Sequence, residues 1–257
     1  MSKIKILCIL QARMGSSRLP GKVLKPILGT PMLAHQVNRL KTVKNIDKLI
    51  IATSTEKADD AIELLCNKIK ISCFRGDKND VLDRFYQAAQ VDMPEYIVRL
   101  TGDCPLIDPE VVSLVVDFHL QNNVEYTSNC NPPTLPDGLD VEIFSFKALK
   151  IAWEQSKMPS EREHVTPFIR NNDFFTCQNF YYHTDLSQHR WTVDEEKDFE
   201  FVDEVYKHLY SQNKNFALSE ILALLAERPE LLKINNLINR NEGLIKSENK
   251  DKEQGFD

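Results

Sequence analysis

The 257-residue sequence contains no apolar run that approaches the roughly 18 residues of a membrane-spanning helix. Its first apolar run, at residues 4–10, is too short for a signal peptide, and no small-residue cleavage site follows it. We therefore expect no membrane span and a cytoplasmic location. A buried first strand is the better interpretation of residues 4–10.

Cysteine patterns of the kind that bind zinc are also absent. None of the six cysteines belongs to a CxxC pair or to a close Cys/His cluster. This argues against a zinc site and, without an export signal, against disulfides. The sequence also lacks the positive charge of a polyanion binder, because its formal net charge is -6. We expect no nucleic-acid partner, whereas local basic clusters still allow a small anionic substrate.

Strand-like and helix-like segments alternate along the chain, which is typical of an α/β protein. The strand-like segments are apolar along their length, so both of their faces are expected to be buried. This predicts a doubly wound, mostly parallel sheet. The expected strands are residues 4–10, 48–52, 71–74, 96–100, 125–127, 141–144, 174–182 and 189–193. The expected helices are residues 32–40, 58–67, 80–89, 109–120, 146–155, 161–170, 198–209 and 218–225.

The expected organisation is a single domain over residues 1–241. Within it, Asp108 followed by Pro109 predicts the capped start of a helix. Residues 242–257 are polar and charge-rich, and we expect them to form a disordered tail.

The most informative segment is the loop of residues 11–22, which directly follows the first expected strand. It contains two glycines, two serines, two arginines and one lysine. Ligands of doubly wound sheets bind at the carboxyl ends of the strands, and backbone amides, hydroxyls and cations are the groups that hold a triphosphate. The loop is neither a Walker A loop nor a GxGxxG dinucleotide loop. A solvated basic turn is the alternative interpretation.

Residues 11–24 resemble the signature loop of the nucleotide-sugar pyrophosphorylase superfamily. The resemblance is strongest to the cytidylyltransferase branch that includes CMP-Kdo and CMP-sialate synthetases, and within it to the SpsF-like family of spore-coat polysaccharide biosynthesis. Further resembling segments are residues 75–77, 80–85, 99–109, 135–144, 161–167 and 190–201. The resemblance implies the nucleotide-diphospho-sugar transferase fold, a GT-A-like Rossmann fold. It also implies a small insertion at residues 125–190 for acceptor binding and homodimer formation.

Two aspartates are candidate metal ligands. Asp103 follows the expected strand 96–100, at the edge of the sheet where one or two carboxylates plus a triphosphate suffice for Mg²⁺. Asp194 lies just before an expected helix, where an N-cap or an acidic first turn is the alternative interpretation. In the resembled families, aspartates at these two places bind the same metal ion. The resemblance therefore implies Mg²⁺ as cofactor, with Asp103 and Asp194 as its ligands.

The candidate acceptor residues lie in the second half of the chain. Asp140 and Glu142 are two residues apart on an expected strand, so both point to one face. That face suits hydroxyls of a sugar or an amine, and a solvated strand face is an equal alternative. Asp137 lies in a turn-rich stretch and is interpreted as a turn residue. Arg162 suits an acceptor carboxylate or phosphate, and the resemblance places it with His164 near the acceptor pocket, although a lone histidine is more often structural.

The nucleotide is expected to contact the first loop, the residues after the second expected strand and the end of the fourth. The expected catalytic residues are Arg13, Arg18, Lys22 and Asp103. The expected nucleotide ligands are Gln11, Ala12, Arg13, Met14, Gly15, Ser16, Lys22, Thr53, Ser54, Thr101 and Gly102. An acceptor oxygen would attack the α-phosphorus in line, so positioning and charge neutralisation supply most of the catalysis, without a covalent enzyme intermediate.

The sequence thus predicts a magnesium-dependent cytidylyltransferase. It would transfer CMP from CTP to a sugar acid or a related small anionic acceptor for surface-polysaccharide biosynthesis and release pyrophosphate. The preference for CTP over UTP, the sugar-acid acceptor and the role in surface-polysaccharide biosynthesis rest on the resemblance alone. One alternative is a GT-A-type glycosyltransferase, although Gly102-Asp103-Cys104 departs from the DxD motif of that class. The sequence is also compatible with another sugar-phosphate nucleotidyltransferase or with a non-catalytic nucleotide-sensing protein.

Overall fold

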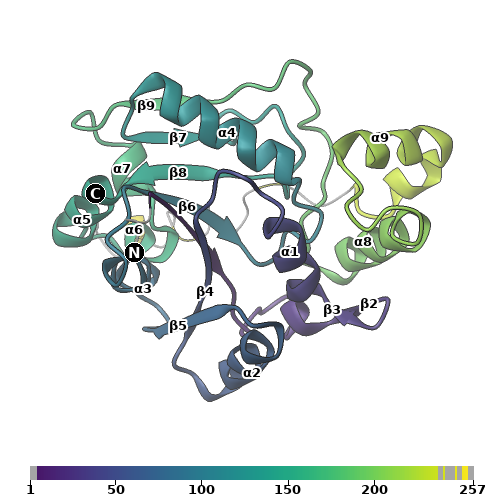
Figure 1. Cartoon of the computed structure of the whole chain (residues 1–257), viewed down its shortest axis with the longest axis horizontal. Coiled ribbons are helices and arrows are strands. Elements are labelled where there is room, and N and C mark those ends of the chain that lie inside the picture. Colours follow the sequence, from purple (N-terminus) through teal and green to yellow (C-terminus); the bar gives the residue numbers. More distant parts are fainter. Residues whose placement is uncertain (1–4, 237–239, 241–246, 248–250, 254–257) are drawn as a thin grey trace.

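The computed structural model describes residues 5–236, 240, 247 and 251–253. Its framework is a seven-stranded sheet (Figure 1). The strands of this sheet are β1 (Ile6–Gln11), β4 (Lys48–Ser54), β5 (Ser72–Gly76), β6 (Tyr96–Thr101), β7 (Tyr126–Ser128), β8 (Glu142–Ser145) and β9 (Cys177–Asn179). They lie in the order β5-β4-β1-β6-β8-β7-β9. Strands β5, β4, β1 and β6 are parallel, whereas β8 runs antiparallel to both of its neighbours. The predicted mostly parallel sheet is confirmed.

Helices cover both faces of this sheet. They are α1 (Met32–Leu40), α2 (Asp60–Ile69), α3 (Val81–Gln90), α4 (Pro109–Asn122), α5 (Phe146–Gln155), α6 (Pro159–His164), α7 (Pro167–Arg170), α8 (Glu196–Leu209) and α9 (Leu218–Glu227). Short elements between them are the strands β2 (Pro26–Ile27) and β3 (Thr30–Pro31), which form a hairpin, and the 3-10 helices η1 (Lys22–Leu24), η2 (Lys57–Asp59) and η3 (Pro229–Lys233).

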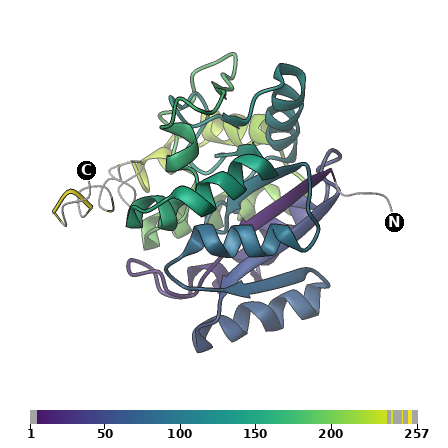
Figure 2. The ribbon, with the colours of Figure 1, turned by 90° about the vertical axis from the view of Figure 1, so that its left-hand side faces the viewer.

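The side chains of β1 divide between two buried clusters. Ile6, Cys8 and Leu10 belong to one cluster, and Leu7 and Ile9 to the other, because successive side chains of a strand point to opposite faces. The first cluster includes α1, α4 and α8, and the second includes α3 and α5. Figure 1 shows α3 and α5 on one side and α1 and α8 on the other, and Figure 2 shows α3 and α5 across the near face. The predicted doubly wound arrangement is therefore confirmed.

Two helices that begin near the carboxyl edge of the sheet start at an aspartate N-cap. Asp80 Oδ1 accepts a hydrogen bond from Asp83 N at 2.9 Å at the start of α3, and Asp108 Oδ1 accepts one from Glu110 N at 2.8 Å at the start of α4. The second bond confirms the predicted cap. Such caps stabilise a helix by about 1 kcal/mol each.

Two expected elements differ from the structure. The helix predicted at residues 161–170 is two short helices, α6 and α7, separated at Val165, whose φ is 72°. Pro167 lies in the first turn of α7, where its missing N–H needs no partner, so it begins a new helix after this break. The prediction of a strand at residues 189–193 is also wrong. Its backbone forms one isolated bridge, between Arg190 and Asp137, and Val193 N donates to Asp103 O at 2.8 Å.

The strands of the predicted insertion at residues 125–190 extend the main sheet as β8, β7 and β9. The domain boundaries and the homodimer contact remain predictions. Most of the predicted disordered tail, residues 242–257, lies outside the described residues. Of its described residues, Ser247 contacts His164, and Asp251 Oδ2 accepts a hydrogen bond from Ser160 N at 3.0 Å. Within the described part of the chain, no helix has the length and apolar character needed to cross a membrane.

Candidate active site

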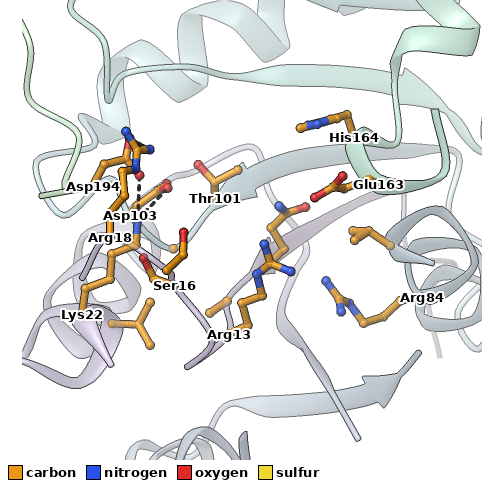
Figure 3. A pocket seen from close by; sticks show the side chains of 16 residues that line it. Arg13, Ser16, Arg18, Lys22, Arg84, Thr101, Asp103, Glu163, His164 and Asp194 are labelled. Atoms are coloured by element: carbon orange, nitrogen blue, oxygen red, sulfur yellow. Dashed lines mark hydrogen bonds and ion pairs between the residues drawn. The ribbon is translucent and has the colours of Figure 1, made fainter. Parts of the chain in front are cut away.

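Two adjoining cavities open at the carboxyl ends of β1 and β6. The first, of about 320 Å³, is lined by the loop of residues 11–22, the residues after β6, and parts of α3 and α6 (Figure 3). The second, of about 350 Å³, is lined by the residues after β6 and by parts of residues 130–142, 164–170 and 192–194. Five residues line both cavities, so the cavities share a wall. These residues are Arg18, Thr101, Asp103, His164 and Asp194.

The backbone of the first loop is closed by its own hydrogen bonds. Met14 O accepts bonds from Ser16 N at 2.9 Å and from Gly21 N at 3.0 Å. Gly21 has a φ of 72°, in the left-handed region that favours glycine. The buried carboxylate of Asp59 anchors the loop, because its Oδ1 accepts from Met14 N at 2.7 Å. The loop is thus held in a fixed shape, with its cations facing the cavity.

The segment before α8 brings Asp194 to Asp103. Val193 N donates to Asp103 O, as described above, and Thr192 Oγ1 donates to the same oxygen at 3.3 Å. Gly102 is required beside Asp103, since a Cβ there would lie 2.9 Å from the Cβ of Ala12. The two aspartates, which are far apart in the sequence, therefore lie together on the shared wall.

Lys22 lies between these two carboxylates. Its Nζ donates to Asp194 Oδ1 at 2.9 Å, to Asp103 Oδ2 at 3.3 Å and to Val193 O at 2.6 Å, and Lys22 is only 8% exposed. Burial alone would lower the pKa of Lys22, but the two carboxylates raise it above its ordinary value. In the same way Lys22 holds the pKa of Asp103 low despite burial of that carboxyl group. Figure 3 shows this cluster at one end of the first cavity.

The donor set of this cluster fits a hard divalent cation. Asp103 and Asp194 converge on one ammonium group, so their oxygens can share a single cation. Among the described residues, no group of three or more His, Cys, Asp or Glu side chains forms a metal-binding cluster. A cation held by two carboxylates would therefore have to complete its shell with phosphate oxygens and water, which is how Mg²⁺ is commonly bound.

Most of the expected nucleotide ligands line the first cavity. The expected site residues on its wall are Gln11, Ala12, Arg13, Ser16, Arg18, Lys22, Thr101, Gly102, Asp103, His164 and Asp194. Met14 and Gly15 are not on this wall, although the backbone of Met14 shapes the loop. Thr53 and Ser54 are also absent from it. Both are buried, and Ser54 Oγ donates to Asp59 Oδ2. The role of Thr53 and Ser54 as nucleotide ligands remains a prediction.

Glu142 lies on the wall of the second cavity but is saturated with hydrogen bonds. Its Oε1 accepts from the hydroxyls of Tyr126 and Thr166, each at 2.6 Å, and its Oε2 pairs with Arg99. Burial opposes ionisation, but Arg99 and the two hydroxyls hold the pKa of Glu142 below its ordinary value. Glu142 is 5% exposed. The geometry therefore favours a structural role over direct contact with an acceptor.

Asp140 has a different environment on the same wall. Its Oδ1 pairs with Arg240, and Arg240 Nη1 donates to Leu135 O at 3.2 Å. Burial raises the pKa of Asp140 to about 7, against the lowering effect of Arg240, and the nearby Asp137 and Glu142 raise it further. The protonated form of Asp140 is therefore favoured more than that of an ordinary surface aspartate.

Arg162 does not line either cavity. Its Nε donates to Asp80 Oδ2 at 2.9 Å and its Nη1 to Trp153 O at 2.9 Å, so α6 is fastened to α3 and α5. The interpretation of Arg162 as an acceptor ligand is therefore not supported by its position. His164, in contrast, lines both cavities, and its Nε2 lies 3.0 Å from Ser247 Oγ.

Comparison with known proteins identifies the family of this chain. Residues 7–238 match the family model described as Cytidylyltransferase. The chain belongs to the cytidylyltransferase family. It is 35% identical over 233 residues to the spore coat polysaccharide biosynthesis protein SpsF of Bacillus subtilis (strain 168), with 88% of this chain and 95% of that protein covered. The predicted family and the predicted nucleotidyltransferase activity are thereby confirmed.

Solved structures show the same fold. A cytidylyltransferase from Leptospira borgpetersenii serovar Hardjo-bovis (strain JB197) matches with a TM-score of 0.86 and 34% identity, covering 92% of this chain and 100% of that one. A CMP:2-keto-3-deoxy-manno-octonic acid synthetase complexed with CTP matches with a TM-score of 0.59 and 17% identity, covering 79% of this chain and 98% of that one. The second match, at this low identity, supports the fold alone.

Arg84 lines the first cavity of this cytidylyltransferase and was not assigned by the sequence analysis. It lines the first cavity from α3, is 2% exposed, and donates from Nη1 to Asp77 O at 3.0 Å, but it forms no ion pair with any carboxylate of the described residues. Figure 3 shows its guanidinium pointing toward Arg13. Burial and the charge of Arg13 lower the pKa of Arg84 to about 10. The sequence pattern could have indicated that Arg84 is buried, because Arg84 shares a helix face with the apolar residues Val81 and Ala88.

We expect the substitution Arg84→Gln to weaken CTP binding by at least about tenfold, since a hydrogen bond to a charged group contributes about 1.5–3 kcal/mol. A polyanion between Arg84 and Arg13 would also relieve their mutual repulsion. Isothermal titration calorimetry of the folded variant measures its Kd for CTP. The control is Arg75→Gln, which removes a guanidinium that pairs with Asp60 and Glu63 outside both cavities. A CTP Kd within twofold of the unaltered protein would contradict the assignment.

Proposed function

We propose that this cytidylyltransferase binds CTP in the first cavity and transfers CMP to a hydroxyl of a small sugar acid in the second cavity, with release of pyrophosphate. The observation that carries the proposal is the shared wall, which presents Asp103 and Asp194 to both cavities. The similarity to SpsF supports a role in polysaccharide biosynthesis. Membership of the cytidylyltransferase family supports CTP as the nucleotide.

In the proposed reaction, the acceptor oxygen attacks the α-phosphorus and the bond from that phosphorus to the bridging oxygen of the β-phosphate breaks. Water or a nearby carboxylate accepts the proton of the acceptor hydroxyl. Arg13, Arg18 and Arg84 face the first cavity and would neutralise the triphosphate and the departing pyrophosphate. Asp103 and Asp194 would hold a magnesium ion, which when bound supplies further charge neutralisation at the phosphate oxygens.

Lys22 has two sets of partners in this proposal. In the structure, its ammonium satisfies Asp103 and Asp194. An ammonium and a divalent cation would compete for these same oxygens, since like charges repel in a partly buried site. We infer that Lys22 leaves the two carboxylates when the nucleotide binds and donates instead to phosphate oxygens in the same cavity. The ion pair of the free protein would thus keep the two aspartates in place.

A thermal shift experiment with CTP, UTP, ATP and GTP in the presence of Mg²⁺ tests the nucleotide. At 100 times its Kd, CTP should stabilise the folded state by about 2.7 kcal/mol, which raises Tm by roughly 5–10 °C in a chain of this size. The acceptor is tested by pyrophosphate release with 2-keto-3-deoxy-manno-octonic acid and related sugar acids. An equal shift with UTP would contradict the assignment of CTP, and no shift with any triphosphate would contradict the assignment of the first cavity.

A further inference from the structure

Arg190 is a buried arginine that holds three carboxylates at once. Its Nη1 donates to Asp137 Oδ2 at 2.8 Å, its Nε to Asp198 Oδ1 at 2.9 Å and its Nη2 to Asp194 Oδ2 at 3.1 Å. The side chain of Arg190 is 8% exposed. Asp137, which the sequence analysis interpreted as a turn residue, is therefore an ion-pair partner. The planar guanidinium carries five N–H donors in a fixed fork, which is why one arginine can orient several carboxylates together.

The backbone that carries Asp194 is fixed by the same group of residues. Asp198 Oδ2 accepts hydrogen bonds from the backbone N of Asp194 at 2.9 Å and of Glu195 at 3.0 Å, and a third from Arg190 Nη2 at 3.0 Å. Asn235 Nδ2 donates to Asp198 Oδ1 and to Arg190 O, each at 3.0 Å. Both the main chain and the carboxylate of Asp194 are therefore connected to Arg190, directly or through Asp198.

The two carboxylate oxygens of Asp194 have different partners. Oδ1 accepts from Lys22 and faces the side of Asp103, whereas Oδ2 accepts from Arg190 and from Arg18, the latter at 2.9 Å. Arg190 lines neither cavity, so it does not compete for phosphates. It is therefore placed to restrain one oxygen of Asp194 while the other stays directed at the position that Lys22 shares with Asp103.

We propose that Arg190 is a positioning residue that holds the Asp194 carboxylate in the orientation needed to bind the metal ion. This inference rests on the proposed function, in which Asp103 and Asp194 are the metal ligands. Groups that hydrogen-bond to metal ligands typically change metal affinity by about 10- to 100-fold when they are replaced. Lysine in place of Arg190 keeps the charge, but its single ammonium cannot reproduce the planar fork that reaches Asp137, Asp194 and Asp198 together.

The test measures Mn²⁺ binding to the CTP-saturated full-length protein by the water-proton relaxation enhancement of the ternary complex, with Mn²⁺ and CTP without protein as the reference. The variants are Arg190→Lys, Asp194→Asn and the double variant. We expect Arg190→Lys to weaken Mn²⁺ binding by about 10- to 100-fold. In the double variant, Arg190→Lys should add little to the loss caused by Asp194→Asn, because it acts through that carboxylate. The matched control is Arg75→Lys, whose arginine bridges Asp60 and Glu63 away from the site.

Stability is followed separately by Tm, and CTP binding is measured in EDTA, since a purely structural role of Arg190 would lower stability without a selective loss of Mn²⁺. If Arg190→Lys does not fold, Asp198→Asn replaces it, because asparagine has no charge and only one acceptor oxygen, so it cannot accept from Arg190 Nε and from Asp194 N and Glu195 N with separate oxygens as the carboxylate does. The inference is overturned if the folded variant binds Mn²⁺ within twofold of the unaltered protein while Asp194→Asn loses it. Absence of Mn²⁺ binding to the unaltered protein with CTP would instead overturn the proposed metal site itself.

Discussion

The substitution Asp103→Asn is expected to lower kcat by on the order of a thousandfold, since a catalytic metal ion contributes several kcal/mol to phosphoryl-transfer transition states and about 1.4 kcal/mol corresponds to a factor of ten. Asparagine keeps the shape of the side chain and removes the charge that faces Lys22. The fold should persist, because Asp103 O, which receives the bonds from Val193 and Thr192, is a backbone atom.

The measurement is the rate of pyrophosphate release with CTP and the acceptor, with Tm recorded for each variant. Asp92→Asn is the matched control, because it breaks a lysine–aspartate pair of the same type, Lys48 with Asp92, that lies outside both cavities. Such partly exposed pairs contribute about 0–1 kcal/mol, so this control should keep its activity. Asp103→Asn with near-normal activity in Mg²⁺ would show that Asp103 is not a ligand of the catalytic metal.

The strand pattern was sufficient to place the first loop and Asp103 at the same edge of the sheet. The apolar segments 4–10 and 96–100 could be recognised as strands of one mostly parallel sheet, and the residues that follow such strands meet at one edge. The pairing of Asp103 with Asp194 was different in kind. Nothing in their spacing relates them, and the prediction rested on the resemblance to known cytidylyltransferases.

What the sequence could not determine is which partner a polar side chain selects in the fold. Thr53 and Ser54 are the last two residues of β4, and the same edge rule favoured them as ligands, yet the side chain of Ser54 bonds to Asp59. Arg162 lies in a segment that resembles the acceptor region, yet Asp80 binds it. Such pairings depend on contacts between residues far apart in the chain, and neither periodicity nor local propensity encodes them.

The role of Arg190 could not be predicted from the sequence for the same reason. In sequence it is one arginine before an acidic run, and Asp198 is readily explained as an acidic residue in the first turn of α8. Only the fold reveals that Arg190 collects Asp137, Asp194 and Asp198 around one guanidinium. The loop cations, in contrast, could be recognised because they are clustered within twelve consecutive residues, 11–22.

The substitution Lys22→Met is expected to change activity and metal binding in opposite directions. Loss of a cation that stabilises phosphate charge should lower kcat by about 10²- to 10³-fold. At the same time, Mn²⁺ should bind to the nucleotide-free protein at least about tenfold more tightly than before. Each contact of the ammonium with a carboxylate in this partly buried site contributes more than the roughly 1.4 kcal/mol that a tenfold change requires.

The reason for the opposite signs is that Lys22 occupies, in the free protein, the position between Asp103 and Asp194 where a metal ion would bind. Methionine has a similar length and no charge, so it leaves both carboxylates available. Titration of nucleotide-free protein with Mn²⁺ measures the affinity, and Lys48→Met, which removes the ammonium paired with Asp92, is the matched control. If Lys22→Met binds Mn²⁺ no more tightly than the unaltered protein, Lys22 does not compete with the metal. The aspartates would then require CTP itself, rather than release of the ammonium, to complete the metal site.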